Sequence, residues 1–91
     1  MRYINPKYIT ILGFDRFPAN QMTNEQLGNI LGNYGDVIIP VQEVYADIFL
    51  TGKKKTKLDL NKGKDIPRDI FAEFKTSEGK RYEITLRCYY R

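Results

Sequence analysis

The segment that most constrains the fold is KTKLDL, residues 55–60, in which polar and apolar side chains alternate strictly. Successive side chains of a β-strand point to opposite faces, so this period of two predicts a strand with one buried and one solvated face. The solvated face would carry Lys55, Lys57 and Asp59, and the buried face Thr56, Leu58 and Leu60. We therefore expect a sheet with a second layer of structure covering its apolar side.

This strand lies in a basic segment, residues 51–64, which holds six lysines and a single acid, Asp59. The net charge of the segment is +5, whereas that of the whole chain is +4, so the remaining residues are close to neutral. Charge that is concentrated in one segment says more about a partner than a diffuse excess does. We predict a turn at Gly52, Lys53 and Lys54 before the strand, and a loop over residues 61–64 after it.

Length and composition exclude several classes of protein. The chain has 91 residues, enough for one modest core, and we expect a single domain over residues 1–91. It contains no histidine and one cysteine, Cys88, which excludes tetrahedral zinc sites, disulfides and histidine-dependent catalytic pairs within the chain. No apolar run reaches the length of a membrane span or a signal-peptide core. We expect an intracellular protein, in the cytoplasm or nucleus, with no metal, no cofactor and no membrane contact.

The clearest helix signal is MTNEQLGNILGNYG, residues 22–35. Thr23 and Gln26 have the spacing of a capping box, and an apolar stripe follows at the helical period. Gly35 stands where a left-handed C-terminal cap would end the helix. The sequence therefore predicts one amphipathic helix that begins at residue 23 and ends before Gly35.

Strand signals surround this helix. Residues 7–15 and 37–39 are rich in β-branched side chains, and Pro40 predicts an edge, a bulge or a break. Residues 65–71 predict a short second helix, because Ile66 and Ile70 are one turn apart. Residues 71–75 and 81–90 predict a hairpin around the turn SEGK, with Cys88 on its apolar side as a small buried hydrophobe.

The order of these elements predicts an α+β fold, the ferredoxin-like β-α-β-β-α-β sandwich, whose four-stranded antiparallel sheet carries both helices on one face. Within that fold, ITILGF (residues 9–14) resembles the first-strand hexamer of the RNA-recognition-motif (RRM) family. MTNEQLGNILGNYGDV resembles the first helix of the same family and the entry into its second strand. The resemblance implies a domain that binds RNA on the open face of its sheet.

The chain departs from that family at the positions that read RNA. The family stacks bases on aromatic side chains at the second position of the hexamer and at two positions of the third strand. Here the first position is Thr10, and the third strand offers Lys55, Lys57 and Asp59 instead. None of these side chains has a π-face, so we do not expect the base-reading chemistry of the family.

A narrower resemblance covers GKKKTKLDLNKGKDIPRDI and YEITLRCYYR. This succession is similar to the degenerate RRM-like domain of Gag-like proteins of non-LTR retrotransposons. There, a basic strand leads through an isoleucine–proline turn into a tyrosine-rich last strand, and zinc knuckles usually follow. The resemblance implies that these 91 residues are one domain of a longer protein.

These observations predict a non-enzymatic nucleic-acid-binding module of a retroelement Gag-like protein, with single-stranded RNA as its partner. Lysines would hold phosphates as point charges, which gives salt-sensitive binding with little sequence preference. Tyr89, and secondarily Tyr90 or Tyr8, would stack one base. The predicted binding residues are Thr10, Lys53, Lys54, Lys55, Lys57, Lys62, Lys64, Arg87 and Tyr89. We expect no catalytic residues, because Glu25, Glu43 and Glu73 fall on separate elements.

Two alternatives stay open at this point. Exposed lysines also keep strand edges soluble, without any ligand. A degenerate domain of this kind can instead bind a protein partner, or a second copy of itself through an edge strand or through the glycine-containing helix. In that case Leu12, Tyr89 and Tyr90 would supply apolar and aromatic contacts.

Overall fold

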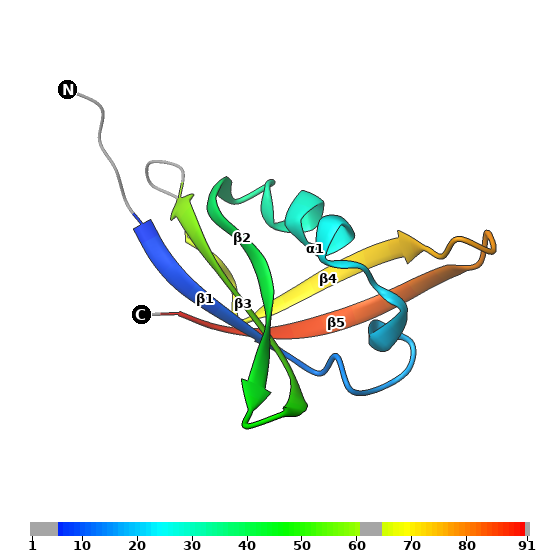
Figure 1. Ribbon diagram of the computed structural model, residues 1–91. Coiled ribbons are helices and arrows are strands. Elements are labelled where there is room, and N and C mark those ends of the chain that lie inside the picture. The colour runs from blue at the N-terminus through cyan, green and yellow to red at the C-terminus, as the bar shows by residue number, and fades with distance from the viewer. Residues whose placement is uncertain (1–5, 61–64, 91) are drawn as a thin grey trace.

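The computed structural model describes residues 6–60 and 65–90, and within them five strands and one α-helix. Figure 1 shows the arrangement of these elements. In chain order they are β1 (Pro6–Leu12), the short 3₁₀ helix η1 (Ala19–Gln21), α1 (Asn24–Leu31), β2 (Gly35–Ala46), β3 (Phe49–Leu60), β4 (Asp69–Lys75) and β5 (Arg81–Tyr90).

The five strands form one sheet in the order β2-β3-β1-β5-β4, and every neighbouring pair is antiparallel. β1 is the central strand, between β3 and β5. Two long hairpins, β2–β3 and β4–β5, flank it, and their ends project from the sheet in different directions (Figure 1). Both hairpin turns therefore lie at the periphery of the sheet, away from its central strand β1 (Figure 1).

One face of the sheet carries the core. The alternation predicted for residues 55–60 is confirmed, because Thr56, Leu58 and Leu60 are buried. Ile9 and Ile11 of β1 and Leu86 and Cys88 of β5 point to the same side. They pack with α1 and the segment before it, which supply Phe14, Ala19, Met22, Leu27 and Leu31. Among residues 6–60 and 65–90, no helix covers the opposite face of the sheet, which we call the open face.

The prediction of a ferredoxin-like fold is wrong. The sheet has five strands rather than four, and the described residues contain one α-helix rather than two. Residues 65–68 have no regular structure, and the predicted second helix is replaced by strand β4. Ile66 and Ile70 are both buried, but Ile70 belongs to a strand whose seven residues all pair with β5. The hairpin predicted over residues 71–75 and 81–90 therefore exists and begins earlier, where the helix was expected.

The predicted helix is present with its capping box. The Thr23 hydroxyl accepts a bond from the Gln26 backbone at 3.1 Å, and the Gln26 side chain accepts from the Thr23 backbone at 2.9 Å. Its C-terminal cap is Gly32 rather than Gly35, and α1 ends at Leu31. Gly35 instead begins β2, where it faces the backbone of Asp59 on β3. Glycine at position 35 therefore allows β2 to approach β3 closely.

The predicted turn at Gly52, Lys53 and Lys54 is also wrong. All three residues lie inside β3, and the chain turns at residues 47–48, where Asp47 has a φ of 58°. β2 is an edge strand, and its register against β3 shifts at three places, one of them between Ile39 and Gln42. Pro40 therefore lies on an edge strand at an irregularity, two of the outcomes predicted for it. The loop predicted for residues 61–64 lies outside the described residues.

Cys88 is fully buried, which confirms its predicted place on the apolar side. Burial raises the pKa of its thiol from 9.0 to about 11, with a smaller contribution from the carboxylate of Asp69. Because the thiolate is the reactive form, we expect Cys88 to react with iodoacetamide at pH 8 at least about 100-fold more slowly than a free thiol. Mass spectrometry of quenched samples measures this rate, and denaturant should restore it.

The same shift predicts the direction of a pH effect on stability. Since the unfolded thiol ionises near 9.0 and the folded one near 11, rising pH between these values favours the unfolded state. A Cys88→Ala variant should lose this part of the alkaline destabilisation. A folded protein that is alkylated at the rate of a free thiol would contradict the assignment.

Candidate nucleic-acid interface

The open face of the sheet brings together residues from the three inner strands. In the β1–β3 register Thr10 lies opposite Lys55 and Tyr8 opposite Lys57. In the β1–β5 register Thr10 lies opposite Tyr89, and Leu12 opposite Arg87. Because residues directly opposite share a face, the sequence prediction that these side chains lie together is supported by the pairing.

Most of these residues, but neither Lys57 nor Arg87, line a groove with a volume of about 870 Å³ that runs over β1, β3 and β5 and reaches β2. The lysines of the groove lie on β3, and its aromatic rings lie on β1 and β5. The lining includes Tyr8, Thr10, Lys53, Lys55, Gln42 and Tyr89. A groove of this composition offers cations and flat apolar surfaces side by side.

Three tyrosines line the groove, and Tyr8 and Tyr89 are the more exposed of them. Tyr8 is 61% exposed and Tyr89 is 47% exposed, so both rings present area to solvent. The Lys57 ammonium lies 4.8 Å from the centroid of the Tyr8 ring, a cation–π contact. The sequence prediction ranks Tyr8 below Tyr89, although the alternation of Tyr8 and Thr10 with Ile9 places both on the open face. The groove thus has two stacking surfaces where one was predicted.

Arg87 is less available than predicted. Its Nε donates to Asp69 at 2.8 Å, and this hydrogen bond is the main reason that the pKa of Arg87 is raised. Tyr90 is also engaged, because its hydroxyl donates to Asp65 at 2.6 Å, which raises its pKa. We therefore treat neither residue as a principal ligand of the groove.

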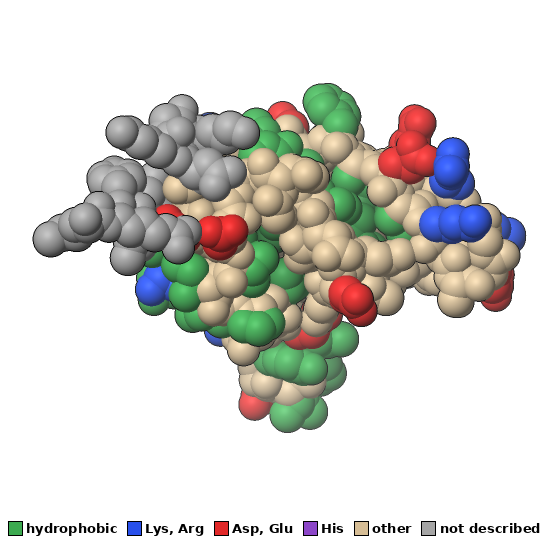
Figure 2. Space-filling model, turned by 90° about the horizontal axis from the view of Figure 1, so that it is seen from above, with side chains coloured by type: hydrophobic (Ala, Val, Ile, Leu, Met, Phe, Trp, Pro, Cys, Tyr) green, Lys and Arg blue, Asp and Glu red, His purple; other side chains and the backbone are tan. Residues whose placement is uncertain are grey.

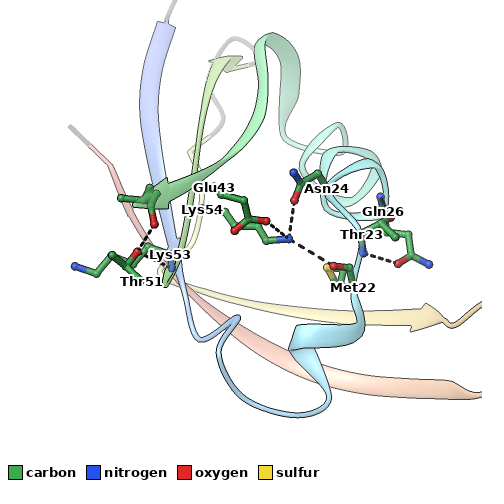
Figure 3. Close-up of polar contacts among 9 residues, drawn as sticks. Met22, Thr23, Asn24, Gln26, Glu43, Thr51, Lys53 and Lys54 are labelled. Carbon is green, nitrogen blue, oxygen red and sulfur yellow. Dashed lines mark hydrogen bonds and ion pairs between the residues drawn. The ribbon is translucent and has the colours of Figure 1, made fainter. Parts of the chain in front are cut away.

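Lys54 is not in the interface, which corrects the sequence prediction. It is only 5% exposed and points to the core side of β3. Its Nζ contacts Asn24 Oδ1 at 2.6 Å, Glu43 Oε1 at 3.3 Å and the carbonyl of Met22 at 3.5 Å (Figure 3). The ammonium also lies 4.6 Å from the centroid of the Phe14 ring. This lysine joins β3 to β2 and to the start of α1, and a buried cation with these partners has a structural role.

The other predicted lysines divide into two groups. Lys53 and Lys55 are exposed and Lys57 is half-buried, all on the open side of β3. The backbone N–H of Lys53 donates to the Thr51 hydroxyl, which itself donates to the carbonyl of Val44 (Figure 3). Lys62 and Lys64 lie outside the described residues. Three lysines of the predicted six therefore remain in the candidate interface.

The far end of the β4–β5 hairpin carries both signs of charge. Figure 2 shows Lys or Arg and Asp or Glu side chains together at the right, the direction in which this hairpin projects in Figure 1. Residues 73–83 contain three basic and three acidic side chains, a net charge of zero. The charge at this end of the hairpin is thus balanced, whereas the lining of the groove includes Lys53 and Lys55 and no acidic side chain among the described residues.

The end of the β2–β3 hairpin is apolar. Its large side chains are more than half exposed: Tyr45, Ile48, Phe49 and Leu50. We call these four residues the hairpin tip. Exposed apolar side chains that are contiguous mark contact sites more often than isolated ones do.

Other kinds of site find no support in the described part of the chain. Among its residues there is no group of three or more His, Cys, Asp or Glu side chains that could hold a metal ion. Nor does it contain a helix that is long and apolar enough to cross a membrane.

Comparison with known proteins adds no relative. No family model matches the sequence, and neither the curated proteins nor the solved structures give a significant match.

Proposed function

We propose that the protein is a non-enzymatic module that binds single-stranded RNA through the groove on the open face of its sheet. The observation that carries this proposal is the juxtaposition of Lys55 and Lys57 with Tyr8 and Tyr89, across three adjacent strands. Lysines at this spacing neutralise phosphates, and the tyrosine rings stack exposed bases. Both contacts are indifferent to base identity, so the binding has little sequence preference.

Single strands fit this surface better than a duplex does. Bases must be unstacked to lie on tyrosine rings, and only a single strand presents them without prior unpairing. Thr10 lies between Lys55 and Tyr89 and has a short side chain, which leaves room above the centre of the groove. The strand would therefore run over β1 with its phosphates toward β3 and its bases toward β5.

The retroelement part of the prediction stays a prediction. It rests on the resemblance of residues 52–70 and 82–91 to Gag-like proteins, and the gene sequence that follows Arg91 tests it. Cysteine and histidine at zinc-knuckle spacing would support membership of that class.

A three-lysine variant tests the groove. We expect Lys53→Gln/Lys55→Gln/Lys57→Gln to weaken binding of a labelled single-stranded RNA at about 50 mM salt, because three phosphate contacts are removed. The plot of log affinity against log salt should become shallower by about 2, from about 0.7 for each contact on a single strand. Fluorescence anisotropy at several salt concentrations measures both quantities.

The matched control removes the same charge elsewhere. Arg16→Gln/Arg68→Gln/Lys80→Gln takes three exposed cations from outside the groove, and it should leave the salt slope close to that of the wild type. No binding by the wild type at about 50 mM salt, or equal losses in both triple variants, would refute the proposal. Parallel titration with single-stranded DNA shows whether the 2′-hydroxyl contributes.

A protein-interaction module is the second candidate, and the hairpin tip is the observation that favours it. Phe49 and Ile48 are 69% and 78% exposed at the end of a projecting hairpin, away from the groove. Aromatic and aliphatic anchors of this kind fill pockets on protein partners. A Phe49→Lys variant that loses a protein partner and retains RNA affinity would assign this role to the tip.

A further inference from the structure

Strand β4 is an edge of the sheet, and within the described part of the chain β5 is the only strand that pairs with it. Cys88 N donates to the carbonyl of Arg68 and Thr76 N to that of Lys80, so even-numbered residues of this strand bond to β5. The odd-numbered residues therefore direct their N–H and C=O groups away from β5. Gln26 supports this direction, because its Nε2 donates to the outward carbonyl of Lys75 at 2.6 Å.

The two edges of the sheet differ in how well they could accept another strand. β2 contains Pro40, which has no N–H, and its register against β3 shifts at three places. β4 has no proline, and its seven residues pair with β5 without a shift. Phe71, in the middle of β4, is 83% exposed. Regular backbone and an exposed aromatic side chain make β4 the edge that is open to strand addition.

We infer that β4 pairs with β4 of a second copy of this chain, antiparallel about a twofold axis at Ala72. This register places Phe71 opposite the partner's Glu73 and Asp69 opposite the partner's Lys75. Phe71 and Glu73 are both odd-numbered, so their outward N–H and C=O groups can form four bonds across the axis. Gln26 occupies the carbonyl of Lys75, which confines the ladder to its centre.

Charge selects this register over its neighbours. An axis at Phe71 would place Asp69 opposite the partner's Glu73, and an axis at Glu73 would place that carboxylate opposite its own copy. Like charges directly opposite destabilise a strand pair, whereas opposite charges stabilise it. Of these three axes, only the one at Ala72 pairs an acid with a base and sets no like charges against each other. An axis at Phe74 would need the carbonyl of Lys75, which Gln26 occupies.

The pairing has a consequence for the groove. A twofold axis between two antiparallel edge strands is perpendicular to the sheet, so both copies present their open faces on the same side. The two grooves then lie on one continuous surface, and a long single strand could cross both. This consequence rests on the proposed function, but the pairing of β4 does not.

Two variants of one exposed residue test the inference. Phe71→Glu places a carboxylate opposite the partner's Glu73, and Phe71→Lys places an ammonium there. Both lose the same aromatic contact, and neither touches the core. We expect the wild type to dimerise weakly, because one strand pair is a small interface. Phe71→Glu should dissociate about tenfold more readily than Phe71→Lys, since two charge pairs change sign.

Sedimentation velocity over a range of concentrations measures these equilibria, and circular dichroism verifies that each variant is folded. A wild type that stays monomeric at every concentration overturns the inference. Equal dissociation of the two Phe71 variants overturns the register, and dissociation by Phe49→Lys alone assigns the contact to the hairpin tip instead. Lys53→Gln/Lys55→Gln/Lys57→Gln should still dimerise, so loss of RNA binding and loss of pairing are separate results.

Discussion

Replacement of Lys54 by alanine is expected to lower the free energy of unfolding by about 3 kcal/mol. The substitution leaves Asn24 and Glu43 without their shared cation and opens a space beside the Phe14 ring. Urea denaturation followed by circular dichroism measures the change. The adjacent Lys55 is exposed on the open face, and Lys55→Ala should change stability by no more than about 0.5 kcal/mol.

A third variant separates charge from packing. Lys54→Met keeps most of the aliphatic stem and loses only the ammonium, so it should cost less than Lys54→Ala. Because Lys54 points away from the groove, Lys54→Met should keep the RNA affinity of the wild type when both proteins are folded. An Ala variant as stable as the wild type, or a Met variant with a reduced salt slope, would place Lys54 on the surface.

Replacement of Gly35 by alanine should destabilise the protein by at least about 2 kcal/mol. A Cβ at this position would overlap the carbonyl oxygen of Asp59, and backbone cannot move aside as a flexible side chain can. The first residue of β2 would then be forced away from β3. For a domain of this size the melting temperature should fall by about 8–16 °C, which differential scanning calorimetry measures.

Gly28 provides the matched control for this prediction. It lies inside α1, and an added Cβ would meet no atom within 4 Å. Gly28→Ala should therefore stabilise the protein by about 0.5–1 kcal/mol, since alanine is the better helix former. If both alanines change stability in the same direction, then close approach to β3 is not the reason for glycine at position 35.

The local elements could be predicted from the sequence because their signals are local. The capping box at Thr23 and Gln26 lies within four residues, and the alternation of residues 55–60 places Leu58 inward without reference to any partner. The turn SEGK likewise marks the β4–β5 hairpin. The side of the sheet on which Lys55 and Lys57 lie followed from the same alternation.

The errors arose where distant residues decide the outcome. Extended back by one residue, the alternation places Lys54 inward, but a lysine is rarely buried unless it is paired. Its partners come from α1 and β2, and the sequence does not show that these elements meet at this point. A spacing of four residues between two buried isoleucines, Ile66 and Ile70, fits one turn of a helix as well as it fits an extended chain. Pairing with β5 is what makes Ile70 part of a strand.

The place of β1 at the centre of the sheet has a consequence for how the chain folds. Each hairpin can form from residues that are near one another in sequence, but Ile9 pairs with Thr56 on one side and with Tyr90 on the other. Both partners of β1 follow it in the sequence, so β1 gains its second neighbour only when β5 is present. Contacts of such long sequence separation slow folding. We expect a nascent chain that ends before β5 to leave one side of β1 exposed until β5 is synthesised.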